Sequence, residues 1–247
     1  MSLESTIGDL VSKTTLLLDY FGSKKAGIDS AVAAAIAAVP VNKKVLYIHQ
    51  TAGLDTNDGS SGAPLKTIEK AVAMTPVGGV LSIRLLSDYD MAPTILSVEG
   101  ISIEMRTDTI AVRRALRACY FKSPTDASVN LLSCFSANLG AEFSYRDITF
   151  ELPSPPSQGS FSGGDNSLIK VNATSPATML PVKLVNCDVV DKPGATAYLT
   201  SSSTSALLLA VTGTTFPVGF SGRYSAAIAA GTSSQNVPHL VTNIPVM

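Results

Sequence analysis

The stretch that decides the fold runs from Leu46 to Val72, reads LYIHQTAGLDTNDGSSGAPLKTIEKAV, and is followed by Gly78-Gly79. Residues 45–48 alternate as a first strand does. The loop after them is rich in Gly, Asp and Asn, which favour turns, and Thr67 to Met74 has the spacing of a two-turn helix. Helix-like sequence precedes this stretch and strand-like sequence follows it, so we interpret it as the joint between two architectures.

The sequence before the joint predicts a helix. From Leu3 to Val39 there is no proline, and apolar residues recur at alternating steps of three and four, as in a coiled-coil heptad. Pro40 would end this helix, and Gly22-Ser23 could divide it into two arms. An amphipathic helix lying on its own chain's core is the alternative, but no other strong helix is available for packing, so we favour self-association. The predicted trimerisation residues are Ile7, Leu10, Leu17, Phe21, Ile28 and Ala35.

The sequence after Gly79 predicts an all-β body. Short apolar segments broken by turns continue to the C-terminus, and no helical segment separates them. The candidate strands are residues 80–86, 94–98, 101–105, 131–135, 143–145, 148–150, 168–171, 182–185, 189–190 and 207–211. Three segments share one form, in which a polar or small residue stands between two apolar alternations, as at the corner of a β-solenoid. These segments are residues 143–150, 184–190 and 209–216. A β-sandwich would give similar strands and stays open as an alternative.

Composition limits the function classes. Only 15% of the 247 residues are charged, the net charge is −1, and no block of Lys or Arg occurs, so we expect no nucleic-acid partner. No apolar run approaches the length of a membrane span, and Met1-Ser2-Leu3-Glu4 lacks the basic start of a signal peptide, so we expect no membrane insertion. Cys119, Cys134 and Cys187 show no paired spacing and are predicted to be buried free thiols.

Candidate chemistry is sparse. A glycosidase needs two carboxyl groups about 5 to 9 Å apart, and the pairs that sequence spacing offers are Asp147 with Glu151 and Asp188 with Asp191. These acids lie at predicted corners, where solvated turn residues are expected. A Ser-His-Asp triad would have to use His49 or His239.

The Asp/Asn loop superficially resembles a calcium loop. Asp55-Thr56-Asn57-Asp58-Gly59 has the right composition, but the bidentate Glu and the flanking helices are missing. We therefore read it as a structural turn and expect no catalytic residue, no cofactor and no metal ion.

The joint also carries a family resemblance. Its pattern is Gly-x-Asp-x-Asn-Asp-Gly-Ser from Gly53, then Ala-Pro-Leu-Lys-Thr-Ile-x-Lys-Ala-Val from Ala63, then Gly-Gly-Val-Leu from Gly78. This resembles the first segment of pectate-lyase-like right-handed parallel β-helix proteins, including phage tailspikes and tail fibres. The resemblance implies that the segment before Gly78 is a capping helix and that a solenoid begins at Val80.

The N-terminal helix adds to this resemblance. Residues 14–19 and 24–32 look like the N-terminal helix of phage tail-fibre and tailspike chains, which are commonly trimeric. This chain departs from the enzymatic tailspikes in its small size and in lacking an evident carboxylate pair.

These observations give one interpretation with alternatives. We predict a mainly β protein with a helical attachment and trimerisation segment (1–40), a β-helix start with its capping helix (41–79), and a short right-handed parallel β-helix body (80–247). We expect a structural phage appendage, such as a tail fibre, collar fibre or small tailspike-like protein. It would assemble in the host cytoplasm, be exposed on the released virion, and bind itself, other virion proteins and a host surface glycan. A polysaccharide-degrading tailspike and a capsid decoration protein are the alternatives.

The C-terminal segment is poor in charge. Only Arg223 is charged after Lys192, and the segment contains a serine-rich run at residues 201–205. We expect burial against another subunit or virion protein, with burial inside the same chain as the alternative.

Overall fold

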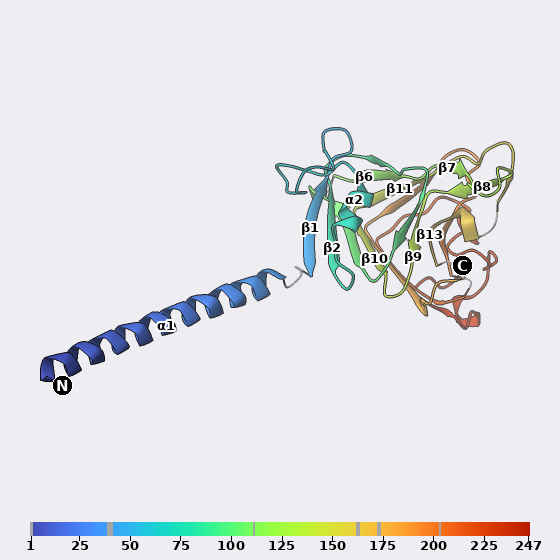
Figure 1. The fold of residues 1–247 in the computed structure, drawn as a ribbon. Helices are drawn as coiled ribbons and strands as arrows, with labels where there is room; N and C mark the ends of the chain where they lie inside the picture. The colour runs from blue at the N-terminus through green and yellow to red at the C-terminus, as the bar shows by residue number, and fades with distance from the viewer. Residues whose placement is uncertain (1, 39–41, 111, 162–163, 172–173, 203) are drawn as a thin grey trace. The chain divides into compact units, whose positions relative to one another are not determined.

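The computed structural model describes residues 2–38, 42–110, 112–161, 164–171, 174–202 and 204–247, without the side chains of residues 35–38. The chain forms two compact units, residues 1–41 and residues 42–247, and each is considered by itself. Helix α1 (Leu3–Ala38) belongs to the first, and the strands belong to the second, which we call the body (Figure 1). The finer division of the body at residue 79 stays a prediction.

Helix α1 confirms the predicted N-terminal helix and corrects one detail. It runs without interruption for 36 residues, so the expected division at Gly22-Ser23 is wrong. A glycine costs a helix interior only about 1 kcal/mol, and the Ser23 hydroxyl donates a hydrogen bond back to the Tyr20 carbonyl (2.9 Å). The predicted end at Pro40 lies outside the described residues.

The body contains one large sheet, which we call the long sheet, with all neighbouring strands parallel. Its strands, in spatial order, are β1 (Lys43–Ile48), β2 (Val80–Leu85), β5 (Ser102–Thr107), β10 (Glu142–Arg146), β14 (Met179–Val185), β17 (Ala206–Thr212) and β18 (Leu240–Thr242).

Smaller sheets complete the body. The second sheet contains β3 (Tyr89–Asp90), β6 (Arg114–Arg117), β11 (Ile148–Leu152) and β15 (Asp188–Asp191). The third sheet contains β4 (Ile95–Val98), β9 (Cys134–Ala137), β13 (Ser167–Val171) and β16 (Tyr198–Ser201). Strand β8 (Val129–Leu132) pairs antiparallel with β7 (Tyr120–Lys122) and parallel with β12 (Ser160–Phe161). Short 3-10 turns occupy Gly164–Asn166 and Ser234–Asn236.

The chain visits the three parallel sheets in a recurring order. From the long sheet it passes to the second sheet and then to the third before it returns, as in β5-β6-β9, β10-β11-β13 and β14-β15-β16. Each strand of these circuits pairs in parallel with the equivalent strand of a neighbouring circuit. The body is therefore a stack of circuits in which backbone hydrogen bonds run from one circuit to the next, and the predicted mainly β class with parallel pairing is observed.

The predicted polar corners are observed between the long and second sheets. Asp147 (φ 55°), Asn186 (φ 52°) and Gly213 (φ 59°) all adopt left-handed backbone conformations. The Asp147 N–H donates to the Val185 carbonyl (3.1 Å), and the Asn186 N–H donates to the Thr212 carbonyl (2.8 Å). Asp and Asn tolerate this conformation better than other non-glycine residues, which explains why these polar residues stand at the turn.

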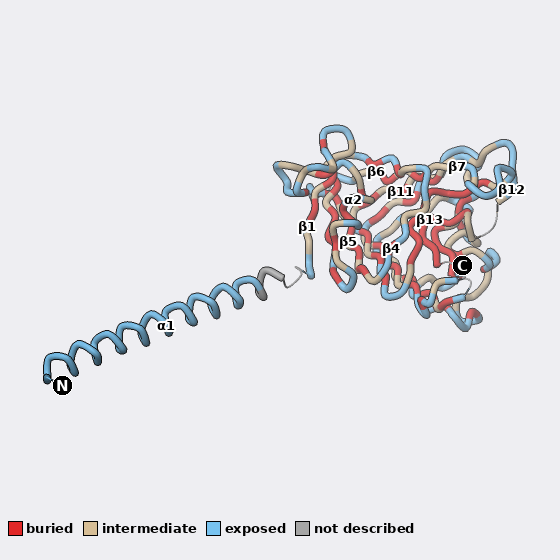
Figure 2. The backbone as a smooth tube through the Cα atoms, in the orientation of Figure 1, coloured by how far each residue is buried: buried red, intermediate tan, exposed pale blue. Residues whose placement is uncertain are grey.

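The interior of the body is one hydrophobic cluster. Alternate residues of the long sheet point inward, and Figure 2 shows buried residues following the strands of the body. Its centre is aromatic: the ring of fully buried Tyr145 lies 5.0 Å from that of Phe150 and 6.1 Å from that of Phe135, between centroids. This continuous core holds successive circuits together.

The joint forms as the sequence predicts. Helix α2 (Ile68–Ala73) begins after Thr67, whose hydroxyl accepts the Lys70 N–H (3.2 Å), and buries Ile68, Ala71 and Val72. The Ile68 N–H donates to the Tyr89 hydroxyl (3.1 Å), which ties the helix to the body. Gly53 cannot carry a side chain, because a Cβ would lie 2.2 Å from the Leu65 carbonyl oxygen.

Sequence reading found the longest strands and missed the shortest. It did not identify β3, β6, β7, β12, β16 or β18, which have two to four residues each. It also gave residues 131–135 as one strand, whereas β8 and β9 meet at Ser133, whose hydroxyl accepts the Cys119 N–H (2.9 Å). Of the cysteines, Cys134 and Cys187 are buried as predicted, and Cys119 is half-buried.

Candidate functional site

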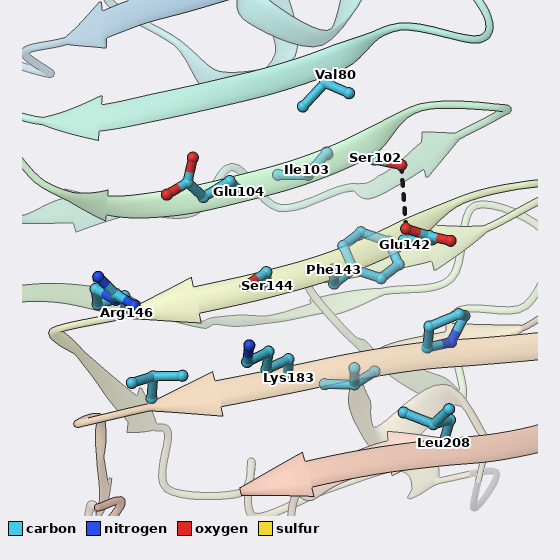
Figure 3. A pocket seen from close by; sticks show the side chains of 13 residues that line it. Val80, Ser102, Ile103, Glu104, Glu142, Phe143, Ser144, Arg146, Lys183 and Leu208 are labelled. Carbon is cyan, nitrogen blue, oxygen red and sulfur yellow. Dashed lines mark hydrogen bonds between the residues drawn. The ribbon is translucent and has the colours of Figure 1, made fainter. Parts of the chain in front are cut away.

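The outer face of the long sheet carries both acidic and basic side chains. A shallow hollow of about 540 Å³ lies over β5, β10 and β14 (Figure 3). Its lining includes the carboxylates of Glu104 and Glu142 and the cationic side chains of Arg146 and Lys183. These side chains alternate along their strands with core residues such as Phe143, so the strand pleat places them on the solvent side.

Three arginines stand in register on this face, and we call them the arginine row. Arg84 of β2 pairs with Arg106 of β5, which pairs with Arg146 of β10. Neighbouring strands lie about 4.8 Å apart, so parallel in-register pairing stacks the three side chains in a line across the sheet. Tyr47 of β1 extends the line at one end, beside Arg84.

The arginine row is short of acceptors. The nearest carboxylate is Glu104, with Oε2 3.9 Å from Arg84 Nη1, which is beyond hydrogen-bond distance. Within the described residues, the buried atoms Arg84 Nη1 and Arg106 Nε have no hydrogen-bond partner. Burial and the neighbouring charge of Arg106 lower the pKa of Arg84. The row is therefore an electrostatically unfavourable group of cations that a bound anion would stabilise.

Two glutamates line the hollow, each held by a serine of the preceding strand. The Ser82 hydroxyl donates to Glu104 Oε2 (2.7 Å), and the Ser102 hydroxyl donates to Glu142 Oε2 (3.2 Å). Burial acts to raise the pKa of Glu104, but the Ser82 hydrogen bond and the charges of Arg84 and Arg106 outweigh it and lower that pKa. Glu104 is therefore ionised at neutral pH.

The first predicted acid pair does not form an open site. Asp147 occupies a corner beside Arg113 and Asn186. Glu151 forms ion pairs with Lys192 (2.7 Å) and Arg117 (3.3 Å). The hydrogen bond from Lys192 is the largest cause of the lowered pKa of Glu151, so this carboxylate is neutralised by the protein itself.

The second predicted acid pair does not form an open site either, because each acid pairs with an arginine. Asp188 forms an ion pair with Arg113, and Asp191 makes a bidentate pair with Arg223 (2.7 and 2.9 Å). Arg223 also donates to the Ala197 carbonyl (2.9 Å). These acids hold circuits and the C-terminal segment together, which is a structural role.

The two histidines belong to opposite edges of the long sheet. His49 follows β1 and His239 precedes β18, with five strands between them. Six strand spacings amount to about 29 Å, so they cannot act together. The Nδ1 atom of His49 accepts the Ala52 N–H (3.2 Å), which is a turn contact.

The Asp/Asn loop uses its carboxylates for its own backbone. Asp55 accepts hydrogen bonds from the N–H groups of Lys66 (3.1 Å) and Thr67 (2.9 Å) and from the Thr67 hydroxyl (2.8 Å). In the described part of the chain no group of three His, Cys, Asp or Glu side chains is arranged to hold a metal ion. The loop positions the start of α2.

Helix α1 carries a second candidate surface. The predicted seam residues Ile7, Leu10, Leu17, Phe21 and Ile28 are between 53% and 65% exposed (Figure 2). The side chain of Ala35 lies outside the described residues. The structure shows a further apolar row on the adjoining heptad position, formed by Val11, Leu18 and Val32, which the sequence reading did not include. No helix in the described residues combines the length and apolarity that a membrane span requires.

The serine-rich C-terminal run is buried within the body itself. Ser201, Ser202 and Ser205 are buried, and the Ser205 hydroxyl donates to the Ala177 carbonyl (2.5 Å). For this run the burial within the same chain, our alternative, applies. Residue 203 lies outside the described residues.

Residues 153–166 are rich in Pro, Gly and Ser, a composition that predicts a projecting loop, but hydrogen bonds attach this segment to the body. The Asn130 side chain donates to the Gln158 carbonyl (2.8 Å), and the Ser160 N–H donates to the Ser128 carbonyl (2.9 Å). Residues 162–163 lie outside the described residues. Sequence reading missed this attachment because it depends on the partner strand β8.

Comparisons with known proteins add little. No protein-family profile matches the sequence, and no curated protein is significantly similar to it. Among solved structures, a rhamnogalacturonan lyase aligns with 11% sequence identity and a TM-score of 0.32, over 69% of this chain and 56% of the lyase. We draw no conclusion about fold or activity from a similarity of this extent.

Proposed function

We propose that this protein is a structural appendage of a bacteriophage particle, such as a tail fibre, collar fibre or small tailspike-like protein. It would assemble through α1 into a homotrimer on the virion, dock onto other virion proteins and attach to a host surface glycan through its body. We further propose that the body is a right-handed parallel β-helix. The recurring circuit order and the joint at residues 46–79 support this architecture.

The observation that carries the proposal is the exposed apolar seam of α1. A single helix has no partner for side chains such as Leu10 and Leu17, which are 65% and 54% exposed. Burying such side chains between helices contributes about 1.5–3 kcal/mol each. A helix with this seam is stable and soluble only when the seam is covered, and further copies of the same heptad cover it.

The width of the apolar face favours three helices. A two-helix seam needs only the first and fourth heptad positions, whereas Val11, Leu18 and Val32 add the fifth. A third helix covers such a wider stripe. Three copies of the body would then act together, so that individually weak contacts with a repetitive host surface combine into avidity.

The matched pair Leu17→Asp and Leu16→Asp tests this assembly. The two leucines are adjacent and both exposed (54% and 65%), but only Leu17 lies on the heptad seam. Light scattering coupled to size-exclusion chromatography should give a trimer mass for the full chain and for Leu16→Asp, and a monomer for Leu17→Asp.

Two outcomes would contradict the assembly. A monomeric wild-type chain would remove the basis of the proposal. Equal effects of Leu16→Asp and Leu17→Asp would mean that the heptad seam is not the contact.

A polysaccharide-degrading tailspike is the second candidate, favoured by the two glutamates of the hollow. Glu142 is in register with Ser102, two residues from Glu104 on the neighbouring strand, so the two Cα atoms are about 8 Å apart. That offset is compatible with a pair of glycosidase carboxyl groups. The ionised Glu104 would then be the general base that activates a water molecule, and Glu142 the general acid, as in an inverting glycosidase. New reducing ends released from capsule or O-antigen by the wild type, and lost in Glu142→Gln, would establish this activity.

A further inference from the structure

The arginine row offers a binding site for repeated negative charge. Arg84, Arg106 and Arg146 form one line across three strands, at a spacing of about 4.8 Å. We propose that this row binds the carboxylate groups of an acidic polysaccharide, lying across the strands of the long sheet. This inference rests on the proposed attachment function and specifies the class of glycan.

The chemistry of the row favours an oxyanion. A guanidinium group presents planar paired donors that match the two oxygens of a carboxylate. Arg84 Nη1 and Arg106 Nε are buried donors without a partner among the described residues, and burying such donors unpaired is unfavourable. A carboxylate placed over the row would bind the exposed guanidinium group of Arg146 and the accessible parts of the other two arginines, and it would reduce the repulsion between the three cations.

The surroundings of the row favour a sugar over a nucleic acid. Ser144 lies two residues before Arg146 on β10 and is in register with Lys183 of β14, and Glu142 lies two residues before Ser144. Hydroxyl, ammonium and carboxylate groups therefore lie on the same face as the arginines. This mixture suits a ligand with isolated acidic groups among many hydroxyls. A nucleic acid would need stacking aromatics and a wider basic surface, whereas Tyr47 is the one aromatic residue in this register line and the net charge of the chain is −1.

Binding of the full-length protein to defined polymers tests the inference. The probes are alginate, hyaluronan and polysialic acid, each beside its carboxyl-reduced neutral form, with oligo-dT as a polyanion control. We expect wild type to bind at least one acidic polymer at least tenfold more tightly than its reduced form. Arg146→Gln and Arg106→Gln should each weaken that binding about tenfold. Lys66→Gln, the same charge change at an exposed residue beside α2, should not.

Every outcome bears on the inference. No binding to any of the acidic polymers, binding unaffected by the two arginine substitutions, or an equal loss in Lys66→Gln would overturn it. Oligo-dT binding as tight as that of the best glycan would replace it with a general polyanion surface. Arg146 is exposed, so Arg146→Gln should retain the wild-type fold, checked by circular dichroism. A trimer that binds none of the glycans sinks this inference alone, whereas a monomer sinks the proposed assembly.

Discussion

Helix α1 and the body differ in how far their apolar side chains are exposed. In α1 every described side chain is exposed, including large apolar residues such as Leu10, Leu17 and Phe21. In the body, aromatic residues such as Phe143, Tyr145 and Phe150 are 2% exposed or less. The body therefore has its own core, whereas under the proposed assembly α1 would gain one from other copies of the chain. Stability should consequently depend on protein concentration for the helix and not for the body.

The largest expected effect comes from replacing a phenylalanine with alanine in each of the two regions. Phe150→Ala removes a fully buried ring in contact with Tyr145 and should lower the free energy of unfolding of the body by about 3–5 kcal/mol. Phe21→Ala removes a ring that is 59% exposed and should leave the unfolding of the body unchanged. Urea unfolding followed by near-ultraviolet circular dichroism measures both, and Phe21→Ala should instead weaken association in sedimentation experiments. A similar loss of body stability in the two variants would break the comparison.

An ion pair of the body should contribute more to stability than an ion pair of α1. Asp191 and Arg223 form a bidentate pair with side chains 23% and 17% exposed. Asp191→Asn removes the negative charge that pairs with Arg223, so we expect a loss of about 2 kcal/mol. The Asp9–Lys13 pair of α1 is 2.8 Å long but its side chains are 64% and 72% exposed. Asp9→Asn should cost no more than about 0.5 kcal/mol. Thermal unfolding at low and high salt tests this, and equal losses would contradict it.

Much of the fold could be predicted from local signals. The heptad of α1 and the buried face of α2 recur at helical spacing over consecutive residues, and both helices form as expected. The corners at Asp147, Asn186 and Gly213 could also be found, because few residue types tolerate their backbone conformation. Strands such as β3 and β16 could not, since two to four residues carry no measurable period.

The candidate site was less accessible to sequence reading. Arg84, Arg106 and Arg146 are 22 and 40 residues apart, and only the pairing of β2, β5 and β10 aligns them. The acids of each predicted pair are close in sequence, but in the folded body each one forms an ion pair with an arginine or lysine or lies at a corner. A signal was present in the alternation of charged and apolar residues along β5 and β10, although it does not reveal the register between them.

Replacing a glycine with alanine should have opposite effects on stability in the two regions. Gly213 has φ +59°, and a Cβ there would lie 2.4 Å from Asn186 Oδ1, so Gly213→Ala should destabilise the body by about 1–2 kcal/mol. Gly22 is in the interior of α1, and a Cβ added there would have nothing within 4 Å, so Gly22→Ala should stabilise the helix by about 1 kcal/mol. Far-ultraviolet thermal melts report both. A stabilised Gly213→Ala would show that the corner does not require a left-handed residue.

The smallest expected effect concerns a single hydroxyl group. Tyr145 is fully buried, and among the described residues its hydroxyl has no hydrogen-bond partner; burial raises its pKa well above the usual value. Tyr145→Phe removes a polar atom that loses its hydration on folding, so we expect a gain in body stability of up to about 1 kcal/mol. Tyr20→Phe, on a side chain of α1 that is 55% exposed, should change nothing. A loss above about 1 kcal/mol in Tyr145→Phe would mean that the hydroxyl is satisfied in solution, and that the core of the body is more hydrated at this position than its packing indicates.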